Sequence, residues 1–183
     1  MTVRKKHLVY LTGFMGSGKS TIAPILANTI GFNHIDIDEE IEKASGKRIS
    51  EIFSDSGEQY FRELERKLLT RVSESGGCVV SLGGGTVIND VNLAIVKSSG
   101  ILVYLKADID QIVKRLRHKT NRPMITSADG TVLPEDILRE RVKVLLSQRE
   151  PYYNQADIVV TTGNRRVGLT IDEIVRQITR FRV

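Results

Sequence analysis

Cysteine and tryptophan are scarce or missing in this chain of 183 residues, which contains one cysteine, Cys78, and no tryptophan. A single cysteine cannot form an intramolecular disulfide, which fits a reducing compartment. Cys78 is followed by Val79 and Val80, a context that predicts an inert, buried thiol. Aromatic residues make up only 5%, and no block of lysine and arginine alternates with aromatics as in a base-stacking surface. We therefore expect no nucleic-acid partner.

Long apolar segments are also missing. No stretch approaches the roughly 20 residues that a membrane-spanning helix needs. Residues Met1 to Lys6 are basic and precede an apolar run, as in a signal peptide, but the run is brief and leads into a glycine-rich motif that cleavage would destroy. The sequence therefore predicts a cytoplasmic protein with no membrane partner.

The length and charge of the chain indicate one domain that handles anions. A chain of 183 residues, 40% of them hydrophobic, can bury the core of a single α/β domain, so we expect one domain over 1–183, acting as a monomer. The formal net charge is +5 and the isoelectric point is near 9.4. Because base-stacking features are missing, we attribute this charge to small anionic substrates.

One eight-residue motif carries the strongest functional signal. Residues Gly13–Ser20 read G-x-x-x-x-G-K-[ST], the phosphate-binding pattern, between a strand-like run and a helical pattern. Glycines let backbone N–H groups turn toward phosphates, Lys19 adds a positive charge at their β/γ end, and the Ser20 hydroxyl suits Mg²⁺. The predicted nucleotide contacts here are Gly16, Ser17, Gly18, Lys19, Ser20 and Thr21.

Apolar runs alternate with helical patterns along the chain. Five short runs are typical of buried parallel strands: 7–12, 33–38, 78–82, 101–105 and 158–161. Helical spacing occupies 21–30, 39–44, 50–72, 89–97, 108–116, 135–148 and 170–181. This order predicts a parallel sheet covered on both faces, with ligands at the carboxyl ends of the strands. The segment 117–134 has no clear period and is typical of a lid.

Two carboxylates follow the second predicted strand. Asp36 and Asp38 are two residues apart, so in a strand both side chains would lie on one face, toward the ligand cleft. One carboxylate there could order the hydration of Mg²⁺, and the other could accept a proton or hydrogen bond from an attacking hydroxyl. The alternative is that Asp38 only caps a helix beginning at Glu39.

Three consecutive glycines follow the third predicted strand. Gly83, Gly84 and Gly85 remove side chains where the backbone could approach a ligand, and their N–H groups could hold a carboxylate or a hydroxyl. Three glycines cost conformational entropy that a simple turn would not require. A flexible turn remains the alternative.

Arginine suits a carboxylate or a transferring phosphoryl group, and three arginines are candidates for such contacts. Arg62 precedes the apolar Leu64 in its predicted helix. Arg122 precedes Pro123 in the irregular segment, and Arg149 lies where a helix is expected to stop before Pro151. From the residues alone, a solvated surface charge is the favoured alternative for each of the three.

Taken in order along the chain, these motifs resemble the shikimate kinase family. The shared features are the phosphate loop, an Asp-x-Asp pair, a basic residue followed by x-x-Glu, an apolar pair leading to three glycines, and an Arg-Pro pair. Here they read Gly13–Ser20, Asp36-Ile37-Asp38, Arg62-Glu63-Leu64-Glu65, Val79-Val80-Ser81-Leu82-Gly83-Gly84-Gly85 and Arg122-Pro123. The resemblance implies a three-layer αβα P-loop kinase fold with a five-stranded parallel sheet and a lid at approximately 114–134.

The resemblance also implies an activity: ATP-dependent phosphorylation of the shikimate 3-hydroxyl, with Mg²⁺ as cofactor, on the route to chorismate and the aromatic amino acids. The implied catalytic residues are Asp38, Lys19 and Arg122, with Ser20 and, through water, Asp36 at the Mg²⁺. The acceptor region is approximately 36–66, and the implied shikimate contacts are Asp38, Arg62, Gly83, Gly84, Gly85 and Arg149. The implied nucleotide contacts outside the loop are Arg117, Arg122 and Arg166.

Three other functions are compatible with parts of the sequence. A gluconate or nucleoside monophosphate kinase would share the loop and the fold, but the adenylate-type Asp-Gly-Phe-Pro-Arg motif is missing, since Asp129-Gly130 continues as Thr131-Val132. A GTP-binding switch would need Asn-Lys-x-Asp and Asp-x-x-Gly, and neither occurs. A nucleic-acid module is supported only by the net charge.

Overall fold

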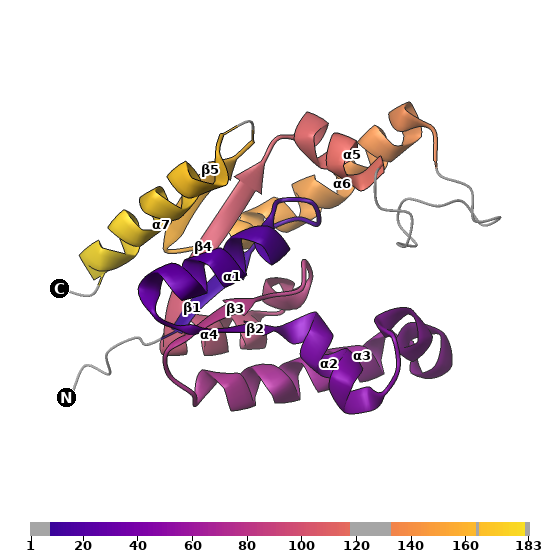
Figure 1. Cartoon of the computed structure of the whole chain (residues 1–183). Helices are drawn as coiled ribbons and strands as arrows, with labels where there is room; N and C mark the ends of the chain where they lie inside the picture. Colours follow the sequence, from indigo (N-terminus) through magenta and orange to yellow (C-terminus); the bar gives the residue numbers. More distant parts are fainter. Residues whose placement is uncertain (1–7, 118–132, 164, 182–183) are drawn as a thin grey trace.

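The computed structural model describes residues 8–117, 133–163 and 165–181 (Figure 1). Five strands form one parallel sheet, as predicted, and their order is β2-β3-β1-β4-β5. The strands are β1 (Leu8–Thr12), β2 (Asn33–Asp36), β3 (Cys78–Ser81), β4 (Gly100–Ala107) and β5 (Ile158–Thr162). β1 lies in the middle, with Leu8 opposite Cys78 on one side and Gly100 on the other.

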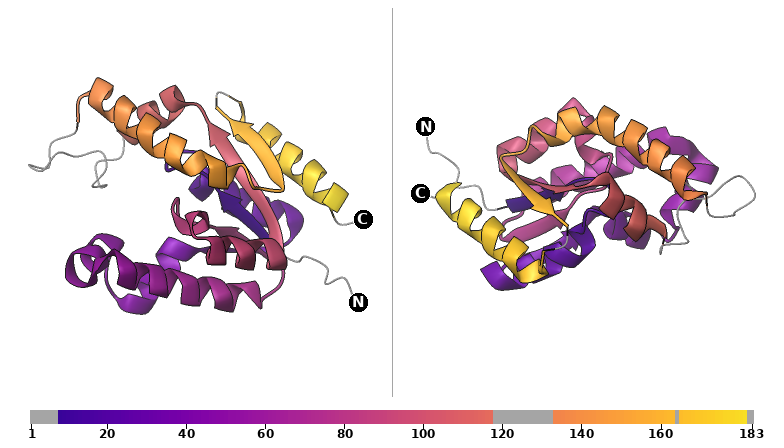
Figure 2. Two further views of the ribbon diagram at one scale, coloured as in Figure 1. Left: turned by 180° about the vertical axis from the view of Figure 1, so that it is seen from behind. Right: turned by 90° about the horizontal axis from the view of Figure 1, so that it is seen from above.

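Helices cover both faces of the sheet (Figure 2). They are α1 (Lys19–Ile30), α2 (Ile37–Ser45), α3 (Ile49–Ser73), the short 3-10 helix η1 (Thr86–Ile88), α4 (Asp90–Ser99), α5 (Ile109–Arg117), α6 (Glu135–Tyr153) and α7 (Val167–Phe181). Among the described residues, no helix is both long enough and apolar enough to span a bilayer.

The alternation of side chains along β1 separates two hydrophobic cores. Leu8 and Tyr10 point to the face covered by α3, α4 and α6, whereas Val9 and Leu11 point to the face covered by α1 and α7. All four side chains are buried, because a parallel strand in the middle of a sheet has helices on both sides. The predicted three-layer αβα architecture is therefore confirmed.

The second strand is shorter than predicted. β2 ends at Asp36 and α2 begins at Ile37, so the expectation that both carboxylates lie on one strand face is wrong. The Asp36 carboxylate accepts the backbone N–H groups of Asp38 (3.0 Å) and Glu39 (3.3 Å) and so caps α2. The capping residue is Asp36, and Asp38 lies in the first helical turn.

Two other helix boundaries differ from the predicted ones. α3 begins at Ile49, one residue before the predicted start, and the Glu51 side chain accepts the N–H of Arg48 at 2.7 Å. Gly57, at φ 80°, interrupts α3 and divides it into two helical pieces. α6 continues through Pro151 to the buried Tyr153, and the Asn154 N–H donates to the Glu150 carbonyl at 2.8 Å.

Candidate active site

The phosphate-loop motif connects β1 to α1, as its flanking patterns predicted. Gly13, Gly16 and Gly18 have φ values of 141°, 83° and 107°, which L side chains rarely adopt. At Gly13 space is limiting as well, because a Cβ atom there would lie 2.6 Å from the Leu105 carbonyl oxygen. The loop shape therefore depends on glycine at these positions.

The loop ends at the N-terminus of α1, where the helix dipole favours an anion. The Lys19 ammonium donates to the loop carbonyls of Gly13 (2.6 Å) and Phe14 (3.3 Å). Ser20 is exposed in the first turn of α1, so its hydroxyl is accessible to a ligand. Within residues 8–117, 133–163 and 165–181, the buried Ser17 hydroxyl oxygen has no hydrogen-bond partner.

Arg115 and Thr162 tie the loop to the neighbouring strands. Arg115 donates to the carbonyls of Gly16 (2.8 Å) and Gly163 (3.2 Å), and the Thr162 hydroxyl donates to the carbonyl of Ser17 at 2.9 Å. These contacts hold the loop beside the end of β5. Sequence reasoning assigned no role to either residue.

Arg117, an implied nucleotide contact, has a carboxylate partner in the structure. It forms an ion pair with Glu135 at the start of α6 and is exposed. Because a helix turns about 100° per residue, positions two apart point in nearly opposite directions. The apolar positions Ile112 and Leu116 could have indicated Arg115 as the arginine nearer the protein interior, because both are buried and Arg115 lies beside them on α5.

The structure does not test the other two implied nucleotide contacts, Arg166 and Arg122. Arg166 is exposed just before α7. Arg122 and most of the predicted lid lie outside the described residues, which exclude 118–132. Their roles stay predictions.

The triple glycine is where the predicted acceptor residues meet. A Cβ atom on Gly83 would lie 2.9 Å from Asp38 Oδ1, and one on Gly85 would lie 2.8 Å from Arg62 Nη2. A Cβ atom on Gly84 would lie 3.5 Å from Arg149 Nη1. None of the three glycines has a positive φ, so these glycines make room for functional side chains and do not relieve backbone strain.

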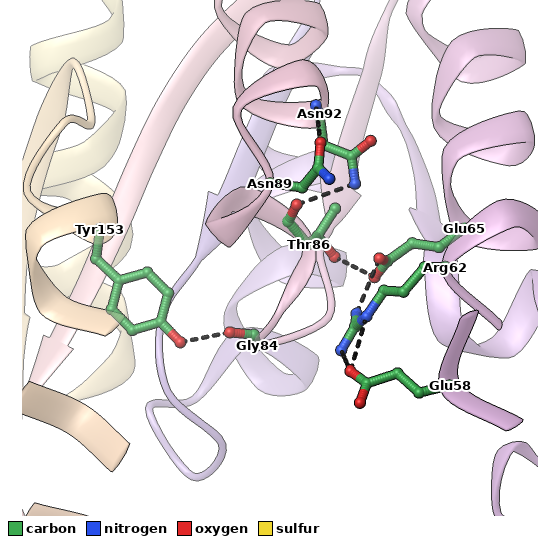
Figure 3. A network of polar contacts seen from close by, with 8 residues as sticks. All are labelled: Glu58, Arg62, Glu65, Gly84, Thr86, Asn89, Asn92 and Tyr153. Carbon is green, nitrogen blue, oxygen red and sulfur yellow. Dashed lines mark hydrogen bonds and ion pairs between the residues drawn. The ribbon is translucent and has the colours of Figure 1, made fainter. Parts of the chain in front are cut away.

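Arg62 is fixed by two carboxylates (Figure 3). It donates to Glu65 from Nη1 at 2.9 Å and to Glu58 from Nη2 at 3.0 Å, and its guanidinium lies 5.2 Å from the Phe61 ring centroid. Burial lowers the pKa of Arg62, but the charges and hydrogen bonds of Glu65 and Glu58 outweigh burial and raise it overall. The guanidinium is therefore a permanent cation at the edge of the triple glycine.

Glu65 is a fully buried carboxylate that connects Arg62 to the triple-glycine loop. The Thr86 hydroxyl donates to Glu65 Oε1 at 2.6 Å, and the Asn92 side-chain amide donates to the Thr86 carbonyl at 3.1 Å (Figure 3). Sequence reasoning quoted Glu65 as part of a motif without giving it a role. In the sequence, Glu65 has the same helical spacing as the apolar residues Phe61, Leu68 and Leu69 of α3. A glutamate at such a position could have indicated a buried carboxylate with a partner.

Arg149 reaches the same glycines from the opposite side, on α6. Its guanidinium carbon lies 5.7 Å from the ring centroid of Phe14, a phosphate-loop residue. Arg149 thus lies between the phosphate loop and the triple glycine. Asp38, Arg62 and Arg149, which come from three different helices, surround one short glycine segment.

Comparison with known proteins agrees with this arrangement. The family model described as "Shikimate kinase" matches residues 15–181. A shikimate kinase of Chlorobaculum parvum is 45% identical, over 96% of this chain and 95% of that protein.

Two solved structures are also similar to this chain. A shikimate kinase from Bacteroides thetaiotaomicron has a TM-score of 0.86 and 29% identity, covering 94% of this chain and 98% of the other. A shikimate kinase from Acinetobacter baumannii, in complex with shikimate, has a TM-score of 0.81 and 30% identity, covering 94% and 93% of the two chains. This chain belongs to the shikimate kinase family.

Proposed function

We propose that the protein transfers the γ-phosphoryl group of ATP to the 3-hydroxyl of shikimate. The observation that carries this proposal is that Asp38, Arg62 and Arg149 meet at the triple glycine. Arg149 also contacts the ring of Phe14, which belongs to the phosphate loop. Membership of the shikimate kinase family supports the same reaction. We expect the protein to act as a cytoplasmic monomer without nucleic-acid or membrane partners.

On the nucleotide side, the residues Gly16–Thr21 would surround the phosphates of ATP. Backbone N–H groups at the start of α1 and the Lys19 ammonium would stabilise the negative charge. Lys19 would exchange its loop carbonyl partners for phosphate oxygens. Arg115, which already contacts Gly16, lies close enough to take part on this side.

On the acceptor side, two arginines would bind the shikimate carboxylate. Arg62 and Arg149 present guanidinium groups on the two sides of the Gly84–Gly85 segment, and a guanidinium can bind a carboxylate with two hydrogen bonds. Asp38 would accept a hydrogen bond from the 3-hydroxyl and orient it toward the γ-phosphorus. Gly83, Gly84 and Gly85 place no side chains of their own where these three residues meet.

Mg²⁺ fits the oxygen donors at this edge of the sheet. Within the described part of the chain, no three histidine, cysteine, aspartate or glutamate side chains gather into a metal cluster. Mg²⁺ usually takes one or two protein oxygens and completes its shell with water and phosphate oxygens, so the Ser20 hydroxyl and, through water, Asp36 would suffice. The bound ion would neutralise charge on the phosphates.

The transfer step needs little covalent participation by the protein. The 3-hydroxyl oxygen forms a bond to the γ-phosphorus while the bond to the β,γ-bridging oxygen breaks, and the hydroxyl proton passes to Asp38. Lys19 stabilises the charge that develops on the transferring group. Arg122 would add to this stabilisation, and the 114–134 segment would exclude water, as the family resemblance implies.

ADP release with a panel of acceptors tests the proposed function. Shikimate, quinate, gluconate and AMP would each be compared with ATP hydrolysis in the absence of acceptor. We expect shikimate to give the strongest stimulation of ADP release, because a ring acid with a matching hydroxyl satisfies both arginines and Asp38, whereas gluconate has no ring and AMP has no carboxylate. Stimulation by gluconate or AMP in place of shikimate would refute the proposal.

A further inference from the structure

Tyr153 connects the last turn of α6 to the triple glycine. Its side chain is fully buried, and its hydroxyl donates a hydrogen bond to the Gly84 carbonyl oxygen at 2.6 Å (Figure 3). Its ring packs on Tyr104 with the ring centroids 5.1 Å apart. A phenylalanine ring would fill this part of the core equally well, so packing does not explain the hydroxyl.

The hydroxyl lies beside the arginine that we assign to the acceptor. A Cβ atom on Gly84 would lie 3.7 Å from the Tyr153 hydroxyl and 3.5 Å from Arg149 Nη1. Arg149 and Tyr153 are four residues apart on α6 and therefore share one face of the helix. Burial raises the pKa of Tyr153 to about 12, although the neighbouring Arg149 lowers it, so the hydroxyl stays a donor at neutral pH.

The hydrogen bond sets the orientation of the peptide between the two arginines. A trans peptide is planar and its C=O and N–H point in opposite directions, so holding the Gly84 carbonyl also fixes the Gly85 N–H. Gly84 lies against Arg149, and Gly85 lies against Arg62. Turn hydrogen bonds from the Thr86 N–H to the Gly83 carbonyl and from the Ile88 N–H to the Gly85 carbonyl, both 3.2 Å, hold the neighbouring peptides. The Tyr153 hydroxyl adds a contact to the Gly84–Gly85 peptide itself.

We propose that Tyr153 is a positioning residue for the carboxylate of the acceptor. Its hydroxyl holds the Gly84–Gly85 peptide so that the backbone and the guanidinium groups of Arg62 and Arg149 meet the same carboxylate. Tyr153 itself does not contact the acceptor. This inference rests on the proposed function, because it assumes that the two arginines bind the acid.

Replacing Tyr153 by phenylalanine tests the role, because Tyr153→Phe keeps the ring and removes only the hydroxyl. We expect the KM for shikimate to rise about 10-fold, with kcat and the KM for ATP within about twofold. The matched control is Tyr10→Phe. Tyr10 is also fully buried and its hydroxyl lies 2.8 Å from Ser99 Oγ, at the opposite end of the sheet. The control should lose comparable thermal stability and leave both KM values unchanged.

The methyl ester of shikimate provides a second readout. Its affinity, measured as a substrate or as a competitor of shikimate, should be changed less than twofold by Tyr153→Phe, because the ester lacks the carboxylate charge. An equal loss for acid and ester would overturn the positioning role, and so would an unchanged KM for shikimate.

An Arg149→Ala variant separates this inference from the proposed function. If Arg149→Ala raises the KM for shikimate and Tyr153→Phe does not, only the role of Tyr153 is wrong. If Arg149→Ala also leaves the KM unchanged, the proposed acceptor site is wrong.

Discussion

The phosphate loop is formed by consecutive residues, Gly13–Ser20, whereas the acceptor side is assembled from α2, α3, the triple glycine and α6. In the loop, glycine is required by backbone conformation, with φ values between 83° and 141°. In the triple glycine, it is required by the side chains that approach from other elements. A local loop carries its function in its own sequence, but the assembled site depends on contacts between distant segments.

This difference predicts two kinds of sensitivity to mutation. Substitutions in the phosphate loop should change the local backbone conformation and the binding of ATP. Substitutions on the acceptor side should weaken the binding of shikimate. Residues that do not contact shikimate, such as Glu65 and Tyr153, should also be sensitive.

The largest expected effect is that of Asp38→Asn. Asparagine keeps the size of the side chain but cannot accept the hydroxyl proton, so kcat should fall about 10²–10⁴-fold. The KM for ATP should change little, because Asp38 lies on the acceptor side, beside Gly83. Steady-state ADP release checks both values. Near-normal turnover would mean that Asp38 only stabilises the first turn of α2 and takes no part in the transfer.

A pair of glycine substitutions compares the two halves directly. Gly13→Ala combines a φ of 141° with a backbone contact at 2.6 Å, so it should lower the free energy of unfolding by about 2–3 kcal/mol. The three atoms nearest to a Cβ on Gly85 belong to the Arg62 guanidinium, and the φ of Gly85 is −106°. Gly85→Ala should therefore cost less than Gly13→Ala, about 1 kcal/mol, while it displaces the guanidinium and raises the KM for shikimate. Urea denaturation and kinetics together check the pair. Equal losses of stability would contradict the proposed difference between the halves.

A smaller effect is expected for Glu65→Gln. Glutamine keeps the shape but weakens the contact with Arg62, so the KM for shikimate should rise about fivefold and unfolding free energy should fall by about 1–2 kcal/mol. Glu63→Gln, on the same helix, is the control, because Glu63 is only partly buried and has no ion pair among residues 8–117, 133–163 and 165–181. Matching effects in both variants would remove the special role of Glu65.

The sequence predicted those parts of the molecule that depend on neighbouring residues. Each strand is a short apolar run and the loop is one continuous motif, so both were identified with boundaries close to those observed. The end of β2 was missed because a short alternating run fits a strand, while the capping of α2 by Asp36 depends on side-chain hydrogen bonds.

Three of the residues that sequence reasoning missed act across long separations. Thr86 binds Glu65 from 21 positions away, Tyr153 binds Gly84 from 69 positions away and Arg115 binds Gly16 from 99 positions away. No local pattern encodes such pairs. The helix that contains Arg115 was predicted correctly, but its direction relative to the loop is set by packing of the whole domain.

The KM values of Arg62→Ala for the two substrates test most directly whether acceptor and nucleotide are recognised by separate halves. The control is Arg66→Ala, one turn further along α3 and exposed. We predict that Arg62→Ala raises the KM for shikimate by about 10–100-fold and leaves the KM for ATP within about twofold. An equal rise in both KM values would contradict the assignment of Arg62 to the acceptor half.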